Sequence, residues 1–109
     1  MKDDKTYLTH IADALNRIVA FTAEGRRSFM EDTKTQDAVV RNFEIIGEAS
    51  KLVSSNFKKR HADIPWREMA GTRDRLIHEY FGVSLAMVWQ IVEQEVPKLR
   101  RQIASLLGH

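Results

Sequence analysis

Four segments of the chain repeat hydrophobic residues at the three- and four-residue spacing of amphipathic helices, and no segment shows the alternation of a strand. The segments are residues 3–23, 36–56, 65–81 and 84–107. In the first, the apolar face consists of Leu8, Ile11, Leu15, Ile18 and Val19. An up-down bundle of four main helices is the simplest all-α fold that buries four such faces together.

Polar residues at the expected ends favour these helix boundaries in the first half of the chain. Asp3 and Asp4 suit the amino end of the first helix, where a negative charge is stabilising. Residues 28–32 are predicted to form a short helical turn. Either Thr33 or Thr35 is then expected to cap the second helix.

Proline and glycine define the second half. Pro65 suits the first turn of the third helix, and Gly82 is placed to end it. Ser84 is expected to cap the fourth helix, which should kink at Pro97 because proline lacks an amide donor. Gly47 lies inside the second helix, where glycine costs about 1 kcal/mol relative to alanine. Close approach of another helix backbone would explain it.

The composition describes one globular domain spanning residues 1–109. Hydrophobic residues make up 43% and charged residues 29% of the chain, which is ordinary for a soluble protein. A formal net charge of +2 permits nucleic-acid contact without demanding it. The basic segment 58–61 is predicted to be a solvated linker in preference to a nucleic-acid contact.

Several kinds of chemistry are disfavoured. Without cysteine there is no disulfide, thiolate zinc site or cysteine nucleophile. The histidines lack metal-ligand spacing, so neither a metal nor another cofactor is expected; they are His10, His61, His78 and His109. The charged segment 1–5 precedes no apolar run, and no stretch approaches the length of a bilayer span. A cytoplasmic protein without a membrane partner is the expectation.

The residues with the most distinctive chemistry lie close together at Arg73, Arg75, His78 and Tyr80. Arginine grips phosphate oxygens through a planar, permanently charged fork, and histidine exchanges protons near neutral pH. This combination suits a phosphodiester better than a metal and indicates metal-free RNA cleavage. Judged by spacing alone, these four residues are better explained as an ordinary solvated helix face with one partly packed histidine.

The residues of this motif and of its flanking segments resemble those of the HEPN superfamily, in particular its HepT-like toxin subfamily. The resemblance is carried by segment 41–49 together with Trp66, Met69, Ala70, Gly71, Arg73, His78, Tyr80, Phe81, Val83, Val88 and Trp89. It covers nearly the whole chain and implies a HEPN-like helical bundle with ribonuclease activity.

The resemblance also implies that two copies of the chain build one site. In a regular helix, residues five apart are rotated by roughly 140°, so Arg73 and His78 do not share one stripe. A homodimer would gather both pairs around one cleft. His78 would then act as general base on the ribose 2′-hydroxyl or as acid on the leaving 5′-oxygen, while Arg73 stabilises the scissile phosphate.

A protein partner follows from the same resemblance. The subfamily implies the toxin of a two-gene toxin–antitoxin pair, with Tyr80 adenylylated by a cognate MNT-type nucleotidyltransferase antitoxin. The alternative for Tyr80 is an amphipathic side chain at a helix end. A second hypothesis for the whole protein is a non-catalytic helical dimer that serves such a partner as an interaction or nucleotide-binding module.

Three further residues are candidates for RNA binding or for support of the site. Asp74 stands where the family commonly has asparagine, and it would pair with a neighbouring arginine or repel RNA. Arg75 would contact phosphate, although an ion pair with Glu79 is the better-supported expectation. Glu48 would orient the catalytic pair or form a helix pair with Lys51, and these alternatives stay equally open.

Overall fold

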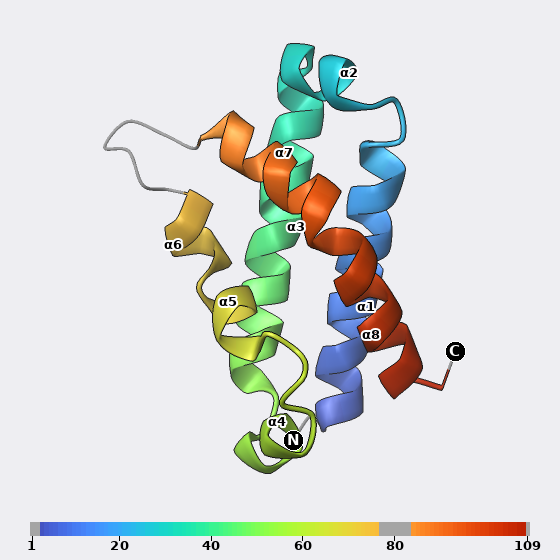
Figure 1. Ribbon diagram of the computed structural model, residues 1–109, viewed down its shortest axis with the longest axis vertical. Helices are drawn as coiled ribbons and strands as arrows, with labels where there is room; N and C mark the ends of the chain where they lie inside the picture. The colour runs from blue at the N-terminus through green and yellow to red at the C-terminus, as the bar shows by residue number, and fades with distance from the viewer. Residues whose placement is uncertain (1–2, 77–83, 109) are drawn as a thin grey trace.

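The computed structural model describes residues 3–76 and 84–108; for Arg73 it describes the backbone only. All regular secondary structure in these stretches is helical. The helices are α1 (Asp4–Phe21), α2 (Arg26–Glu31), α3 (Thr33–Leu52), α4 (Ser55–Arg60), α5 (Trp66–Ala70), α6 (Thr72–Leu76), α7 (Leu85–Gln94) and α8 (Val96–Leu106) (Figure 1). The all-α prediction is confirmed. None of the described helices is long and apolar enough to cross a membrane.

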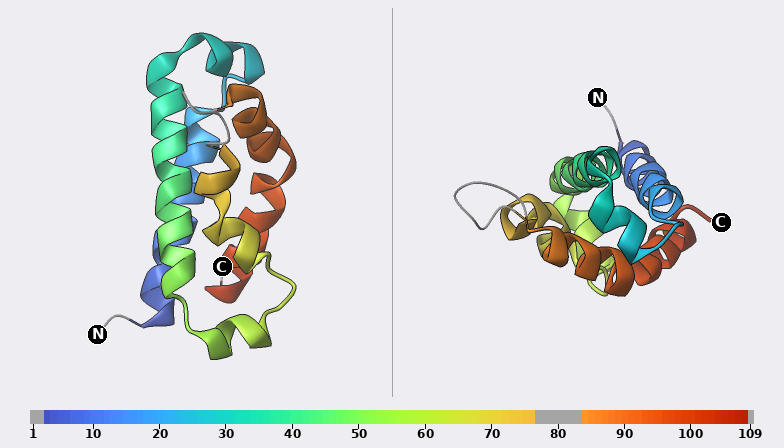
Figure 2. Two further views of the ribbon diagram at one scale, coloured as in Figure 1. Left: turned by 90° about the vertical axis from the view of Figure 1, so that its left-hand side faces the viewer. Right: turned by 90° about the horizontal axis from the view of Figure 1, so that it is seen from above.

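The helices form two layers (Figures 1 and 2). The antiparallel helices α1 and α3 make one layer; α5 and α6 pack on α3, and α8 packs on α1, to make the other. Fully buried side chains from both layers fill the space between them, including Leu15, Ile18, Val39, Val88 and Ile103. The predicted bundle of four main helical segments is therefore confirmed, with short additional helices at its ends.

Carboxylates cap the first two long helices. Asp3 caps α1, as predicted. The predicted threonine cap of α3 is wrong, because Asp32 takes that position and accepts hydrogen bonds from the amide of Lys34 (3.0 Å) and the hydroxyl of Thr35 (2.7 Å). The Thr35 bond is the main reason that the pKa of Asp32 is lowered. One carboxylate thus satisfies two donors at the positive end of the helix dipole.

The second long helix ends at Leu52, earlier than predicted, and the basic segment after Phe57 lies largely in α4 and is not a linker. The cause is a contact with the start of α1. The carboxylate of Asp4 accepts hydrogen bonds from the amide (2.8 Å) and hydroxyl (2.7 Å) of Ser54. Ser54 also caps α4 by accepting from the amide of Phe57 (3.2 Å). This contact holds the chain extended between the two helices.

The expected continuous helix over 65–81 is wrong at Gly71, where α5 ends and α6 begins. The last carbonyl groups of α5 lie directly against Gly47 of α3: a Cβ atom at Gly47 would stand 3.3 Å from the Met69 oxygen and 3.4 Å from the Ala70 oxygen. The predicted close backbone approach at Gly47 is therefore confirmed. The rest of the expected helix, from residue 77, lies outside the described residues.

The predicted kink in the fourth helix is confirmed as a break. Glu95 separates α7 from α8, and Pro97 occupies the first turn of α8, where its missing amide donor is tolerated. Ser84 caps α7, as predicted, by accepting from the amide of Met87 at 3.3 Å. The predicted stop at Gly82 lies outside the described residues. The junction between α7 and α8, at Glu95, is the α7–α8 corner.

We expect Gly47→Val to lower the free energy of unfolding by about 1–3 kcal/mol, because the added methyl groups must push the α5 carbonyls away. Urea unfolding followed by circular dichroism measures the loss. Ala86→Val adds the same side chain at an exposed position of α7, away from any close approach, and should cost less than about 1 kcal/mol through the lower helix propensity of valine. Equal losses in the two variants would contradict a role for the close approach.

Candidate active site

The first half of the motif lies on α6. The backbone of Arg73 belongs to this helix, and Leu76, its last described residue, has a side chain that is only 1% exposed. His78 and Tyr80, the other predicted catalytic and modification residues, lie outside the described residues. The structure therefore locates where the motif begins and how that part of the chain is held.

The two described residues that flank 77–83 are joined to each other. The backbone oxygen of Leu76 accepts a hydrogen bond from the amide of Ser84 at 3.1 Å. The last described residue of α6 and the cap of α7 thus lie side by side. Burial of the Leu76 side chain adds an apolar anchor at the same point.

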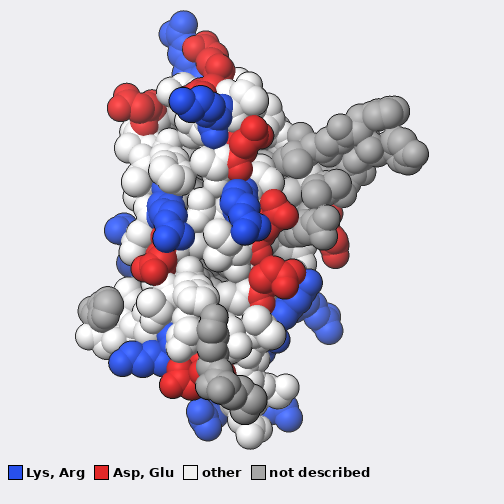
Figure 3. All heavy atoms as spheres, turned by 180° about the vertical axis from the view of Figure 1, so that it is seen from behind, with Lys and Arg blue, Asp and Glu red and all other residues white. Residues whose placement is uncertain are grey.

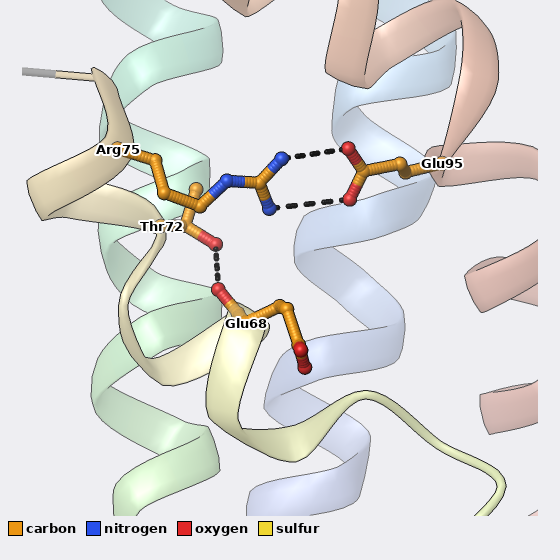
Figure 4. A network of polar contacts seen from close by, with 4 residues as sticks. All are labelled: Glu68, Thr72, Arg75 and Glu95. Atoms are coloured by element: carbon orange, nitrogen blue, oxygen red, sulfur yellow. Dashed lines mark hydrogen bonds and ion pairs between the residues drawn. The ribbon is translucent and has the colours of Figure 1, made fainter.

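Arg75 binds Glu95, a partner that was not expected from the sequence. Its guanidinium donates two hydrogen bonds to the carboxylate of Glu95, at 3.2 Å from Nη1 to Oε1 and 2.7 Å from Nη2 to Oε2. This bidentate pair joins α6 to the corner between α7 and α8 (Figure 4). The hydrogen bonds to Glu95 raise the pKa of Arg75 above its ordinary value, so the side chain stays charged. Glu79, the expected partner, lies outside the described residues.

Asp74 and Glu48 lie on the surface. Asp74 is exposed, and Arg75 pairs with Glu95 in its place. Glu48 forms the helix pair with Lys51 that was one of its two expected alternatives, with 3.7 Å between Oε1 and Nζ and both side chains more than half exposed. A pair of this kind contributes little to stability.

Buried polar groups lie in α3, α6 and α7. Thr72 is 4% exposed and donates its hydroxyl to the backbone oxygen of Glu68 at 2.9 Å, which ties the start of α6 to α5 (Figure 4). Within the described residues, the buried Oδ1 of Asn42 and Nε1 of Trp89 have no hydrogen-bond partner. Asn42 belongs to the α3 segment that carries the family resemblance, but its residue type alone gives no signal of burial.

A cavity of about 210 Å³ adjoins the Arg75–Glu95 pair. Its apolar walls include Phe43, Ile46, Met69, Val96 and Leu99. The charged residues around it are the carboxylates Asp63, Glu68 and Glu95 and the cations Arg75 and Lys98. With more carboxylates than cations, the cavity does not favour a phosphate.

Charges of both signs are interspersed on the face opposite to that of Figure 1 (Figure 3). The described part of this face carries no continuous basic stripe, which is the usual footprint of a nucleic-acid surface. Where the structure describes the chain, no group of three or more histidine and carboxylate side chains is placed to hold a metal ion. On α6, the residue type whose side chain is suited to binding phosphate is arginine.

Comparison with known proteins identifies the family. The family model described as "Ribonuclease HepT-like" matches residues 11–106. The chain is 47% identical to "Probable ribonuclease HepT" of Thermococcus cleftensis over 96% of both chains. It is 39% identical to "Putative RNase TTE0752" of Caldanaerobacter subterraneus subsp. tengcongensis, over 98% of this chain and 96% of the relative. No solved structure matches significantly. The chain belongs to the HepT-like ribonuclease family.

Proposed function

We propose that this protein is a metal-independent endoribonuclease and the toxin of a toxin–antitoxin pair. The observation that carries the proposal is the arrangement of arginine, four residues and then histidine from Arg73 to His78, inside a family match that spans residues 11–106. Relatives of nearly equal length are named as ribonucleases, which supports RNA as the substrate.

The proposed reaction is an attack by the RNA on its own backbone. His78 accepts the proton of the ribose 2′-hydroxyl, the 2′-oxygen bonds to phosphorus, and the bond from phosphorus to the 5′-oxygen breaks. A second proton donor, the His78 of a second copy, protonates the leaving oxygen. Arg73 neutralises the charge that builds on the phosphate. The products carry 2′,3′-cyclic phosphate and 5′-hydroxyl ends, and DNA resists because it lacks the nucleophile.

For this reaction we expect His78→Ala to lower the rate of RNA cleavage by about a hundred- to ten-thousandfold, the usual loss for a general acid or base. Arg73→Lys should also be slower, since lysine keeps the charge but loses the planar fork. Cleavage of labelled RNA in excess chelator, followed by end-group analysis, measures both effects. Circular dichroism checks that each variant is folded.

Two outcomes would contradict this mechanism: cleavage that requires added magnesium, or a fully active His78→Ala variant. Either would show that Arg73 and His78 do not act in the proposed way. A folded protein that cleaves no RNA would favour the non-catalytic interaction or nucleotide-binding module, with Arg73 and His78 as a binding patch. If a binding module arrests growth when it is expressed, the arrest should not depend on the His78 imidazole.

The complete site is proposed to need a symmetric homodimer with α6 near the two-fold axis, because Arg73 and His78, five residues apart, do not share one stripe of a regular helix. Light scattering at micromolar concentration should give twice the chain mass of 12.6 kDa. A monomer that still cleaves RNA would contradict this assembly.

Control of the toxin is proposed to act through Tyr80, modified by an MNT-type nucleotidyltransferase antitoxin. An added nucleotide would repel RNA phosphate and fill the cleft. Intact-mass spectrometry after co-expression with the nucleotidyltransferase encoded beside the toxin gene should detect an adenylyl adduct that disappears in Tyr80→Phe. An adduct that persists in this variant would exclude Tyr80 as the site.

A further inference from the structure

We propose that Glu95 is a positioning residue: its ion pair with Arg75 holds α6, the helix that carries Arg73, in the orientation that the reaction needs. The proposal rests on the proposed function, and it assigns Arg75 to this ion pair and not to RNA phosphate. Glu95 touches no reacting atom in this scheme and acts only through Arg75.

The described part of α6, Thr72–Leu76, is held by its contacts with the rest of the protein. In proteins most of the stability of a helix comes from tertiary packing and little from its own hydrogen bonds. Thr72 ties the start of α6 to α5, and Leu76, the last described residue of the helix, is buried. These contacts hold both sides of the described stretch. The Arg75–Glu95 pair adds a directional link between them, from α6 to the α7–α8 corner (Figure 4).

The form of the pair suits orientation more than stability. The two side chains are 33% and 45% exposed, so solvent screens their attraction and its loss should leave the protein folded. Two hydrogen bonds from one planar fork nevertheless fix both the distance and the angle between the groups. Loss of the pair should therefore let α6 rotate without unfolding the bundle.

The same geometry argues against Arg75 as a phosphate ligand. Both terminal nitrogens of its guanidinium already donate to Glu95, one of them at 2.7 Å. A phosphate would have to displace that carboxylate beside a cavity rim that also carries Glu68 and Asp63. Arg75 is thus neutralised locally, which leaves Arg73 as the phosphate-binding arginine of α6 in the proposed reaction.

The first test is Glu95→Gln, which keeps the size of the side chain and removes its charge. We expect kcat for RNA cleavage to fall about ten- to a hundredfold, as for a small misplacement of a reacting group, with KM and the melting temperature nearly unchanged. Glu31→Gln breaks the exposed Arg27–Glu31 pair and is the matched control, expected to change none of these values. A lower KM in Glu95→Gln, from an arginine freed to bind phosphate, would overturn the proposal, and so would an unchanged kcat.

The second test exchanges the charges in the double variant Arg75→Glu with Glu95→Arg. Restored kcat relative to Glu95→Gln would support positioning, since a glutamate at position 75 cannot bind phosphate. Amide hydrogen exchange separates this proposal from the proposed function. If the wild-type protein cleaves no RNA, the proposed function fails, while faster exchange at residues 72–76 in Glu95→Gln than in Glu31→Gln still supports the restraint of α6. Equal exchange in these two variants would overturn it.

Discussion

The close approach of α5 to α3 at Gly47 is the constraint on which the place of the motif depends. A Cβ atom at position 47 would lie tightly against the Met69 and Ala70 carbonyl oxygens, at 3.3 and 3.4 Å, so glycine allows the closest approach there. Those oxygens belong to the last turn of α5, so the approach fixes where that helix meets α3 and where the chain turns at Gly71. The direction of α6 follows from this turn.

The helices themselves could be predicted because each has an apolar stripe of the right period, and the two-layer bundle follows from burying those stripes. Their interruptions could not. The break after Leu52 depends on Asp4, which lies fifty residues away in sequence from the Ser54 that it binds. The break at Gly71 depends on packing against Gly47. The break near Pro97 is the exception, because the proline ring itself restricts the backbone and removes an amide donor, whatever the residue packs against.

The candidate site, like the fold, could be predicted from the sequence only in part. Arg73 and His78 could be chosen from their chemistry and from the family resemblance, which the family match now supports. The partner of Arg75 could not be chosen, since a local pair with Glu79 fits the helical spacing and Glu95 is twenty residues away. Glu95 becomes a neighbour only because the chain breaks next to Pro97 and forms a corner facing α6.

The charges on α6 bear on why two copies of the chain would be needed. Arg75 is paired with Glu95, so the described part of one α6 carries a single further arginine, Arg73, for a phosphate. Charge that develops in a transition state is best stabilised by donors already fixed around it. In the proposed dimer, two Arg73 guanidinium groups would face one cleft while each Asp74, exposed in the single chain, could remain in water. Doubling the arginine without adding a basic surface reconciles the chain's modest net charge of +2 with an RNA substrate.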